Sequence, residues 1–362
     1  MESLLTFKGT RVFVTGHTGF KGSWLSLWLS KLGAEVYGYS LSPDTTPNNY
    51  MVSSVRDLLS GETIADISDT KTLKNAFKQA DPDYVFHLAA QPLVRKSYTF
   101  PIETFETNVI GSLNVLDTIR NFQRPCSVVM VTSDKCYENT GQIWGYREND
   151  HLGGYDPYSA SKSAAEIAIS SYRRSFFPGE HLDEHGVQIA TVRAGNVIGG
   201  GDWAEDRIIP DAVRALSEKK VVMVRNPNAV RPWQHVLEPL SGYLILAARM
   251  SKTRDPVLSS PWNFGPFCQD ECPVSDLVDL FVKEWGGGHW EQGSLSEASH
   301  EASVLRLSIE KAVHTLRWKP RWNLYKAVKR TAAWYKRYYR DEASSMQDVC
   351  FEDIDAYEGE MK

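Results

Sequence analysis

Residues 11–31, RVFVT-GHTGFKG-SWLSLWLSK, predict a β-strand, a glycine-rich turn and an amphipathic helix over residues 23–31, in that order. A glycine turn that leads into a helix lets backbone N–H groups and the positive helix end approach a pyrophosphate, which a larger side chain would block. The G-x-x-G-x-x-G spacing differs from the commoner G-x-G-x-x-G, so the order of strand, turn and helix carries the inference of a dinucleotide site. The residues expected at this site are Gly16, His17, Thr18, Gly19, Phe20 and Gly22.

The composition is that of an ordinary globular protein. The 362 residues, 42% hydrophobic and 23% charged, suffice for one main domain and a smaller lobe. Because the net charge is -5, with no basic excess to hold a polyanion, neither nucleic acid nor an anionic membrane is expected as a partner. Residues 1–3 lack a basic flank, and no apolar stretch reaches the roughly 18 residues of a membrane span. The expected location is therefore the cytoplasm.

The cysteines predict neither disulfides nor a metal site. The five cysteines, at positions 126, 136, 268, 272 and 350, form an odd set without a C-x-x-C pair, which favours reduced thiols. Cys268, Cys272 and His289 lack zinc-ribbon spacing, so we expect no metal.

Short β-rich runs alternate with helical ones up to about residue 193. The predicted strands are 12–15, 35–39, 84–88, 127–132 and 188–193, and the predicted helices are 23–32, 70–79, 104–121 and 158–174. This alternation predicts an α/β fold with a doubly wound parallel sheet, Rossmann-like, with ligands beyond the carboxyl ends of the strands.

The alternation of strands and helices ends after residue 193, which predicts a second, interleaved lobe. We expect residues 1–193, with about 229–255, to form the NAD-binding domain, and residues 194–228 and 256–340 to form the substrate lobe. The tail, residues 341–362, holds eight acidic residues and one basic residue, and we expect a solvated segment.

The choice between NAD and NADP rests on charge after the second predicted strand. Between Lys31 and Arg56 the sequence contains no Lys or Arg to neutralise a 2′-phosphate, which favours NAD. Ser40 or Asp44 is expected to contact the ribose. Asp66-Ile67 follows a third strand and has two interpretations, an acceptor for the adenine amino group or a plain surface loop.

Tyr158 and Lys162, four residues apart, open a helix and share one of its faces. A phenol with a pKa near 10 is a poor base, but a nearby ammonium and a nicotinamide cation both favour phenolate. The lysine can also hold the nicotinamide ribose. A surface pair is the alternative interpretation, and the upstream dinucleotide turn favours catalysis.

A second polar group follows the most apolar predicted strand. In Thr132-Ser133-Asp134-Lys135 the hydroxyl of Ser133 can bind a substrate alkoxide, and the charged pair can move protons. A capped turn with a surface ion pair is the alternative.

Six segments together resemble the extended short-chain dehydrogenase/reductases, over roughly residues 8–340. They are residues 16–22, His87-Leu88-Ala89-Ala90, Thr107-Asn108-Val109-x-Gly111, Ser133-Asp134-Lys135, Tyr158-x-x-x-Lys162 and Arg193-Ala194-Gly195-Asn196. Residues 16–24, 132–137, 199–203 and 230–236 are similar, more narrowly, to the CDP-glucose branch of the 4,6-dehydratases in this family. Related dehydratases carry Thr-Asp-Glu where this chain has Ser133-Asp134-Lys135, and the lysine is a feature of that branch.

The resemblance implies NAD as a tightly bound cofactor, CDP-glucose as the substrate and CDP-4-dehydro-6-deoxyglucose as the product. It places Leu88, Ala89, Ala90, Asn108 and Thr132 at the cofactor, and Gln91 and Arg306 at the substrate. Asn196, Arg207 and Arg231 are our choices for the diphosphate, because guanidinium groups suit phosphate oxygens, although surface arginines are the plain alternative. Relatives pair helices like 104–121 and 158–174 across a two-fold axis, which implies a homodimer or homotetramer, whereas the apolar stripes alone indicate core packing.

The implied mechanism divides the work among five side chains. Tyr158 removes the sugar 4-hydroxyl proton while hydride leaves C4, and Lys162 and Ser133 hold the alkoxide. Protonated Asp134 donates to the departing 6-hydroxyl, and Lys135, as a neutral amine, is the candidate base for C5.

Two other functions stay open at this point. Another nucleotide-sugar 4,6-dehydratase or a 4-epimerase is the nearer alternative, and Ser133-Asp134-Lys135 speaks against the epimerase. A non-catalytic dinucleotide-binding sensor is the other, and the presence of both Tyr158 and Lys162 speaks against it.

Overall fold

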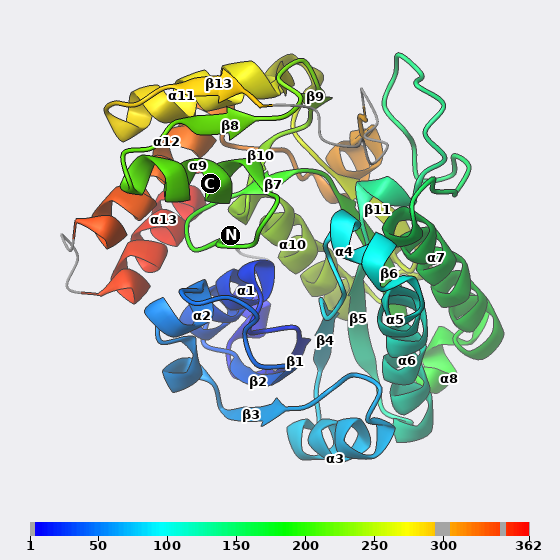
Figure 1. Ribbon diagram of the computed structural model, residues 1–362. Helices are drawn as coiled ribbons and strands as arrows, with labels where there is room; N and C mark the ends of the chain where they lie inside the picture. The colour runs from blue at the N-terminus through cyan, green and yellow to red at the C-terminus, as the bar shows by residue number, and fades with distance from the viewer. Residues whose placement is uncertain (1–3, 294–304, 341–344, 362) are drawn as a thin grey trace.

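The computed structural model describes residues 4–293, 305–340 and 345–361, and its centre is a seven-stranded parallel sheet (Figure 1). The strand order is β11-β6-β5-β4-β1-β2-β3, and every pairing is parallel. This confirms the predicted doubly wound fold. The strands are β1 (Arg11–Thr15), β2 (Glu35–Ser40), β3 (Gly61–Ile64), β4 (Tyr84–His87), β5 (Cys126–Val131), β6 (Val187–Ala194) and β11 (Pro261–Phe264).

Helices cover both faces of the sheet, because alternate residues of each strand point to opposite faces. In β1, Phe13 belongs to the core under α3 (Thr70–Ala80), α6 (Gly111–Phe122) and α7 (Pro157–Phe176). Val12 and Val14 belong to the core on the other face, under α1 (Phe20–Lys31) and α10 (Leu237–Thr253). The helix predicted over residues 104–121 begins earlier, as α5 (Pro101–Phe105), and passes through a π-helical turn over Glu106–Ile110 before α6.

Helix α1 differs from the amphipathic helix that we predicted. All residues from Gly22 to Leu29 are buried, because a further helix, α13 (Met346–Glu360), packs on the face that would otherwise meet solvent. The indole nitrogen of Trp28 donates to a carboxylate oxygen of Glu358 at 2.8 Å.

The predicted solvated tail is therefore wrong for residues 345–361. Helix α13 buries Val349, Ile354 and Tyr357, and its carboxylates pair with cations of the neighbouring helices. These pairs are Lys31–Asp355 with α1, and Arg330–Asp353 and Arg337–Glu352 with α12 (Leu324–Tyr339). The charge count is correct, but the apolar residues are spaced along one helical face and bury that face against the core.

The second lobe is built from three small sheets and two helices. The sheets pair β7 (Val197–Ile198) with β10 (Gln234–His235), β9 (Val230–Arg231) with β12 (Cys272–Pro273), and β8 (Val222–Val224) with β13 (Trp290–Gln292). The helices are α9 (Ile208–Ser217) and α11 (Val274–Trp285). Within the predicted range 256–340, β11 instead joins the central sheet beside β6.

The remaining helices are short: α2 (Asn49–Val52), α4 (Val94–Thr99) and α8 (Leu182–His185). Among the described residues no helix has the length and apolarity to cross a membrane.

Candidate active site

The glycine turn after β1 is folded so tightly that two of its glycines admit no side chain. Gly16 has a φ of +74°, and a Cβ there would lie 2.7 Å from the amide nitrogen of Ala89. A Cβ on Gly22 would lie 2.0 Å from the carbonyl oxygen of Gly16. At Gly19, which caps α1, a Cβ would meet only that same oxygen, at 3.4 Å, so the space over the first turn of α1 is open. This cradle fits a pyrophosphate at the helix N-terminus.

The loop after β4 lies beside this turn and is held by Thr15. The Thr15 hydroxyl accepts the amides of Leu88 and Ala89 at 3.1 and 3.2 Å, and lies 2.7 Å from Nδ1 of His87. Burial lowers the pKa of His87 to about 3, so its ring is neutral. The loop is therefore fixed by neutral hydrogen bonds against the wall of the cradle.

Not every residue predicted for the adenosine end of the dinucleotide site has its side chain beside the glycine turn. The Thr18 hydroxyl lies 2.8 Å from the Ser40 hydroxyl, which joins the glycine turn to the end of β2. The His17 ring is buried against Gly38 on β2 and lies 2.8 Å from a carboxylate oxygen of Glu62. Asp66 is exposed.

Ile67, next to Asp66, is buried against Gly111. After the third strand, Asp66 is therefore an exposed carboxylate and Ile67 is a buried apolar residue.

Asn108 and Gln91 are used within the protein rather than pointing freely into the site. The Asn108 side chain accepts the Gln91 amide at 2.9 Å and donates to the Ser161 hydroxyl on α7 at 2.8 Å. The Gln91 side chain bonds the backbone of Leu93 and the hydroxyl of Thr104. Both residues thus connect the β4 loop to its neighbouring helices.

Ser133, Asp134 and Tyr158 meet at the carboxyl end of β5. Ser133 begins a turn of 3₁₀-helix over Asp134–Cys136, and its hydroxyl donates to Oδ1 of Asp134 at 3.0 Å. The same hydroxyl lies close enough to the Tyr158 phenol to lower the pKa of that phenol. Burial raises the pKa of Tyr158 to about 12, which is opposite to the lowering that we expected from a neighbouring ammonium. A phenol beside the hydroxyl that would hold the substrate alkoxide lies where a proton could be transferred.

The Asp134 carboxyl is the buried acid of the group. Burial raises its pKa above the ordinary value, against the opposing effect of Lys135, Lys21 and Arg231. Its Oδ2 is buried, and within the described chain it has no hydrogen-bond partner. The protein thus presents a buried carboxyl group with a raised pKa and one oxygen without a hydrogen-bond partner among the described residues.

Two lysines of the site come from different elements. Burial lowers the pKa of Lys162 on α7 to about 8, and burial likewise lowers the pKa of Lys21 on α1 to about 8. Lys21 lies within electrostatic range of Asp134, Lys162 and Arg207. We did not predict Lys21, although it stands in the glycine turn itself, where a cation at the start of a helix beside a phosphate site was the available signal.

The predicted substrate arginines separate into two groups. Arg207 pairs with Asp202 at 2.8 Å and lies within electrostatic range of Tyr158, and Arg231 lies within range of Asp134, so both belong to the site. Arg306 instead pairs with Glu271 and donates to the carbonyl of Ile143 at 2.9 Å.

The two other predicted positions have internal partners. The carbonyl of Asn196 accepts the Gln234 amide at 3.1 Å. The Thr132 hydroxyl donates to Glu166 at 2.5 Å.

A parallel sheet with a glycine cradle and a Tyr-Lys pair beside a Ser-Asp strand end defines a class of dinucleotide-dependent enzyme. The profile described as GDP-mannose 4,6 dehydratase matches residues 13–331. The CDP-glucose 4,6-dehydratase of Salmonella typhimurium is 49% identical over 336 residues, which cover 93% of each chain. The chain therefore belongs to the GDP-mannose 4,6-dehydratase family.

More distant proteins share the fold. The structure of the dTDP-glucose 4,6-dehydratase of Streptomyces venezuelae, solved with NAD and TYD bound, superposes with a TM-score of 0.76 at 20% identity and covers 92% of this chain and 99% of that one. The UDP-glucose 4-epimerase of Thermotoga maritima, solved with UDP-glucose, has a TM-score of 0.75 at 19% identity, over 90% and 99% of the two chains.

Proposed function

We propose that this protein is a CDP-glucose 4,6-dehydratase, which converts CDP-glucose into CDP-4-dehydro-6-deoxyglucose and water. The observation that supports the proposal is the position of the Ser133 hydroxyl, which donates to Asp134 at 3.0 Å and lies near the Tyr158 phenol. The 49% identity to the Salmonella typhimurium enzyme supports the cytidine nucleotide.

NAD is the proposed cofactor, and the glycine cradle with the N-terminus of α1 would hold its pyrophosphate. When bound, NAD would supply a hydride acceptor for C4 of the sugar and a hydride donor for C6, with no net change in its oxidation state. Thr18 and Ser40 would line the adenosine end, with Ile67 as an apolar wall, and Leu88, Ala89 and Ala90 would line the opposite side.

The chain's own residues would move the protons. Tyr158 takes the proton of the 4-hydroxyl, while Ser133 and Lys162 hold the alkoxide. The resulting ketone acidifies the C5 hydrogen, which Lys135 would remove. Asp134 donates its proton to the 6-hydroxyl, which leaves as water, and C5 regains a proton at the end.

The three small sheets together with α9 and α11 form the proposed sugar-nucleotide lobe. Arg231 beside Asp134 and Arg207 beside Tyr158 would bind the diphosphate, since a guanidinium group donates to two phosphate oxygens at once. Arg306 would bind the nucleotide after its ion pair with Glu271 breaks.

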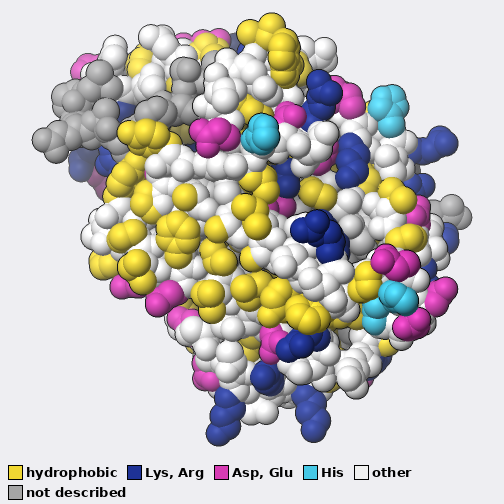
Figure 2. All heavy atoms as spheres, turned by 90° about the vertical axis from the view of Figure 1, so that its right-hand side faces the viewer, with side chains coloured by type: hydrophobic (Ala, Val, Ile, Leu, Met, Phe, Trp, Pro, Cys, Tyr) yellow, Lys and Arg dark blue, Asp and Glu magenta, His cyan; other side chains and the backbone are white. Residues whose placement is uncertain are grey.

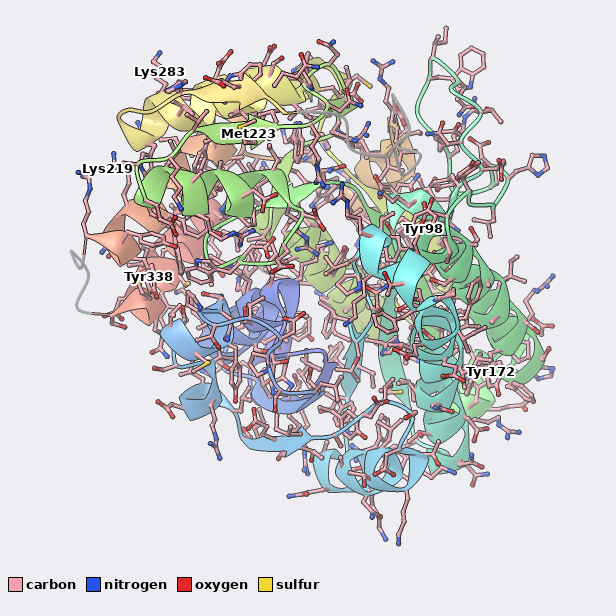
Figure 3. All side chains as sticks on the ribbon, viewed as in Figure 1. Tyr98, Tyr172, Lys219, Met223, Lys283 and Tyr338 are labelled. Carbon is pink, nitrogen blue, oxygen red and sulfur yellow. The ribbon has the colours of Figure 1, made fainter. Side chains whose placement is uncertain are left out.

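A homodimer is the proposed assembly. Exposed apolar side chains gather on the face formed by α4, α5, α6 and α7 (Figure 2), and Tyr98 and Tyr172 lie on this side of the molecule (Figure 3). Ile102, Ile110 and Ile167 on this face are 69%, 51% and 60% exposed, and a contiguous exposed apolar patch often marks a protein–protein contact. We also propose a cytoplasmic location, which the five free cysteines support.

A panel of nucleotide sugars tests the proposed substrate. The purified protein with NAD is incubated separately with CDP-, dTDP-, UDP- and GDP-linked hexoses, and the 4-ketone product is measured by its absorbance in alkali. We expect product with CDP-glucose and at least tenfold less with the others, because the nucleotide must be bound to place the sugar. Equal rates with dTDP-glucose, or an epimerised sugar without a ketone, would contradict the proposal.

A further inference from the structure

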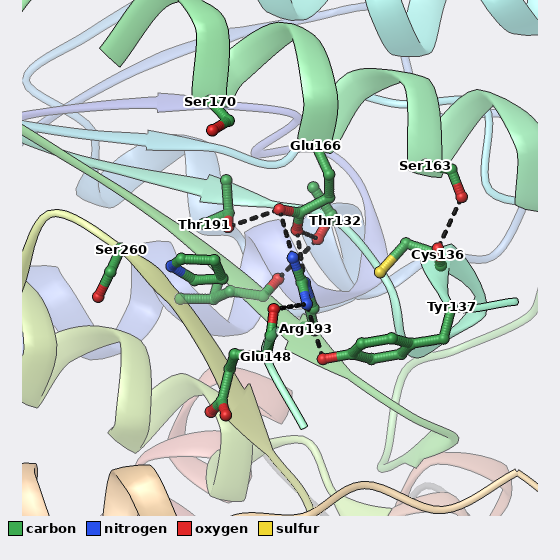
Figure 4. A network of polar contacts seen from close by, with 12 residues as sticks. Thr132, Cys136, Tyr137, Glu148, Ser163, Glu166, Ser170, Thr191, Arg193 and Ser260 are labelled. Atoms are coloured by element: carbon green, nitrogen blue, oxygen red, sulfur yellow. Dashed lines mark hydrogen bonds and ion pairs between the residues drawn. The ribbon is translucent and has the colours of Figure 1, made fainter. Parts of the chain in front are cut away.

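A fully satisfied ion pair lies buried behind the active site (Figure 4). The side chains of Glu166 on α7 and Arg193 on β6 are each 2% exposed. Nε and Nη2 of Arg193 donate to the two carboxylate oxygens at 2.9 and 2.8 Å. The hydroxyls of Thr132 and Thr191 donate to the same two oxygens at 2.5 and 2.8 Å. Each carboxylate oxygen thus accepts two hydrogen bonds.

The third nitrogen of Arg193 contacts the end of the segment that follows β5, residues 132–137. Its Nη1 donates to the Tyr137 hydroxyl at 2.7 Å, and that hydroxyl donates to Oδ1 of Asn263 on β11 at 2.8 Å. Thr132 directly precedes Ser133, and Tyr137 directly follows the short turn over Asp134–Cys136. The segment that carries the proposed acid is therefore held at both ends by one ion pair.

The same pair also holds the helix that carries the proposed base. Glu166 follows Lys162 by four residues and Tyr158 by eight, so the three side chains lie on one face of α7, and all three are buried. The carboxylate of Glu166 thus connects this helix to the end of β5 through Thr132. These contacts fix the distance between two parts of the site that are far apart in sequence.

Stability alone is a weak explanation for such a pair. Apolar residues of similar volume often replace a buried ion pair without loss of stability, because two charges must be desolvated to form it. What an apolar pair cannot supply is the directional set of hydrogen bonds to Thr132 and Tyr137.

We propose that Glu166 and Arg193 are positioning residues that fix Ser133 and Asp134 relative to Tyr158, and that they act through Thr132 and Tyr137. This inference rests on the proposed dehydratase reaction, because its consequence is read in the rate of that reaction. It assigns the Thr132 hydroxyl to the positioning of the active site.

Two isosteric substitutions separate positioning from stability. Thr132→Val and Thr191→Val each remove one hydroxyl that donates to Glu166, but only Thr132 borders the catalytic segment. At saturating NAD we expect Thr132→Val to lower kcat at least roughly tenfold, since small misplacements of reacting groups are costly. The KM for CDP-glucose should stay within about threefold of wild type, because the substrate-binding groups remain.

The controls make the result decisive. Thr191→Val should keep kcat within about twofold of wild type, and Thr132→Ser, which restores the hydroxyl, should recover most of the rate. Tyr137→Phe, at the other end of the segment, should lower kcat like Thr132→Val. Equal kcat losses in the two valine variants, or a normal kcat in Thr132→Val, would overturn the inference. A wild-type protein that forms no ketone would instead contradict the proposed function.

Discussion

Burial tunes the acid and base groups of the active site more than any single charge does. It raises the pKa of Asp134 and Tyr158 and lowers the pKa of Lys162, because each group loses hydration of its charged form. The cations near Asp134 oppose this effect without cancelling it. A carboxyl group that keeps its proton is what elimination of a hydroxyl requires, since hydroxide is a poor leaving group.

Lys135 has the most specific assignment and can be tested by following separate steps. Lys135→Ala should still allow C4 oxidation, seen as absorbance of the reduced cofactor on addition of CDP-glucose. Exchange of the C5 hydrogen with deuterated water should fall at least roughly a hundredfold, since a positioned base contributes that much. Tyr158→Phe serves as the control, because it should abolish both signals. Wild-type exchange in Lys135→Ala would remove Lys135 from this role.

Asp134 sets the expected pH dependence of the elimination step. Its pKa is raised, so the protonated acid persists to higher pH than an ordinary carboxyl group would allow, and the rate should fall as pH rises through that pKa. Asp134→Asn should lower kcat by about a hundredfold or more and should no longer show this fall. We would withdraw the assignment if the asparagine variant kept both the wild-type rate and the wild-type pH profile.

At the scale of elements, the C-terminal helix completes the nucleotide-binding domain. Helix α13 covers the outer face of α1, the helix whose N-terminus forms the cradle. Its own residue Ile354 is fully buried. Ile354→Ala should lower the free energy of unfolding by about 2–5 kcal/mol, measured by urea denaturation. Ile143→Ala, at a 77% exposed position, is the matched control and should stay within about 0.5 kcal/mol of wild type. Equal effects in both variants would mean that α13 contributes no core.

The local elements were predictable from sequence because their signals are local. Short β-rich runs between helical segments located β1, β2, β4, β5 and β6 to within about two residues, and the glycine turn located the cradle. The structure also places Ser133, Asp134 and Tyr158 together.

The long-range features were not predictable in the same way. The burial of α1 depends on contact with α13, more than 300 residues further along the chain, and the cations that pair with the acidic tail lie on other helices. The partners of Arg306 and Gln91 also come from packing, which spacing does not encode.

At the scale of the whole molecule, buried neutral histidines should make the fold sensitive to acid. Burial lowers the pKa of both His87 and His235 to about 3. The unfolded chain takes up protons below pH 6.5 while the folded one does not, so stability present above this pH is lost as pH falls. Each histidine should lower the free energy of unfolding by about 1.4 kcal/mol as the pH falls from 7.5 to 5.5.

Urea unfolding at these two pH values checks the estimate. His235→Gln keeps an acceptor for the Leu237 amide and should lose about 1.4 kcal/mol less than wild type over this interval. His151→Gln, at an exposed position, should behave like wild type. A wild-type pH dependence in His235→Gln would show that this ring titrates normally in the folded protein.

The most direct test of the whole account follows one hydrogen atom. CDP-glucose deuterated at C4 is converted by the protein with NAD in ordinary water, and the product is analysed by mass spectrometry and NMR. We predict that the deuterium appears at C6 of the 4-keto product, since the hydride that leaves C4 returns within the same sugar. Deuterium released to solvent, or restored to C4 without loss of water, would contradict the account.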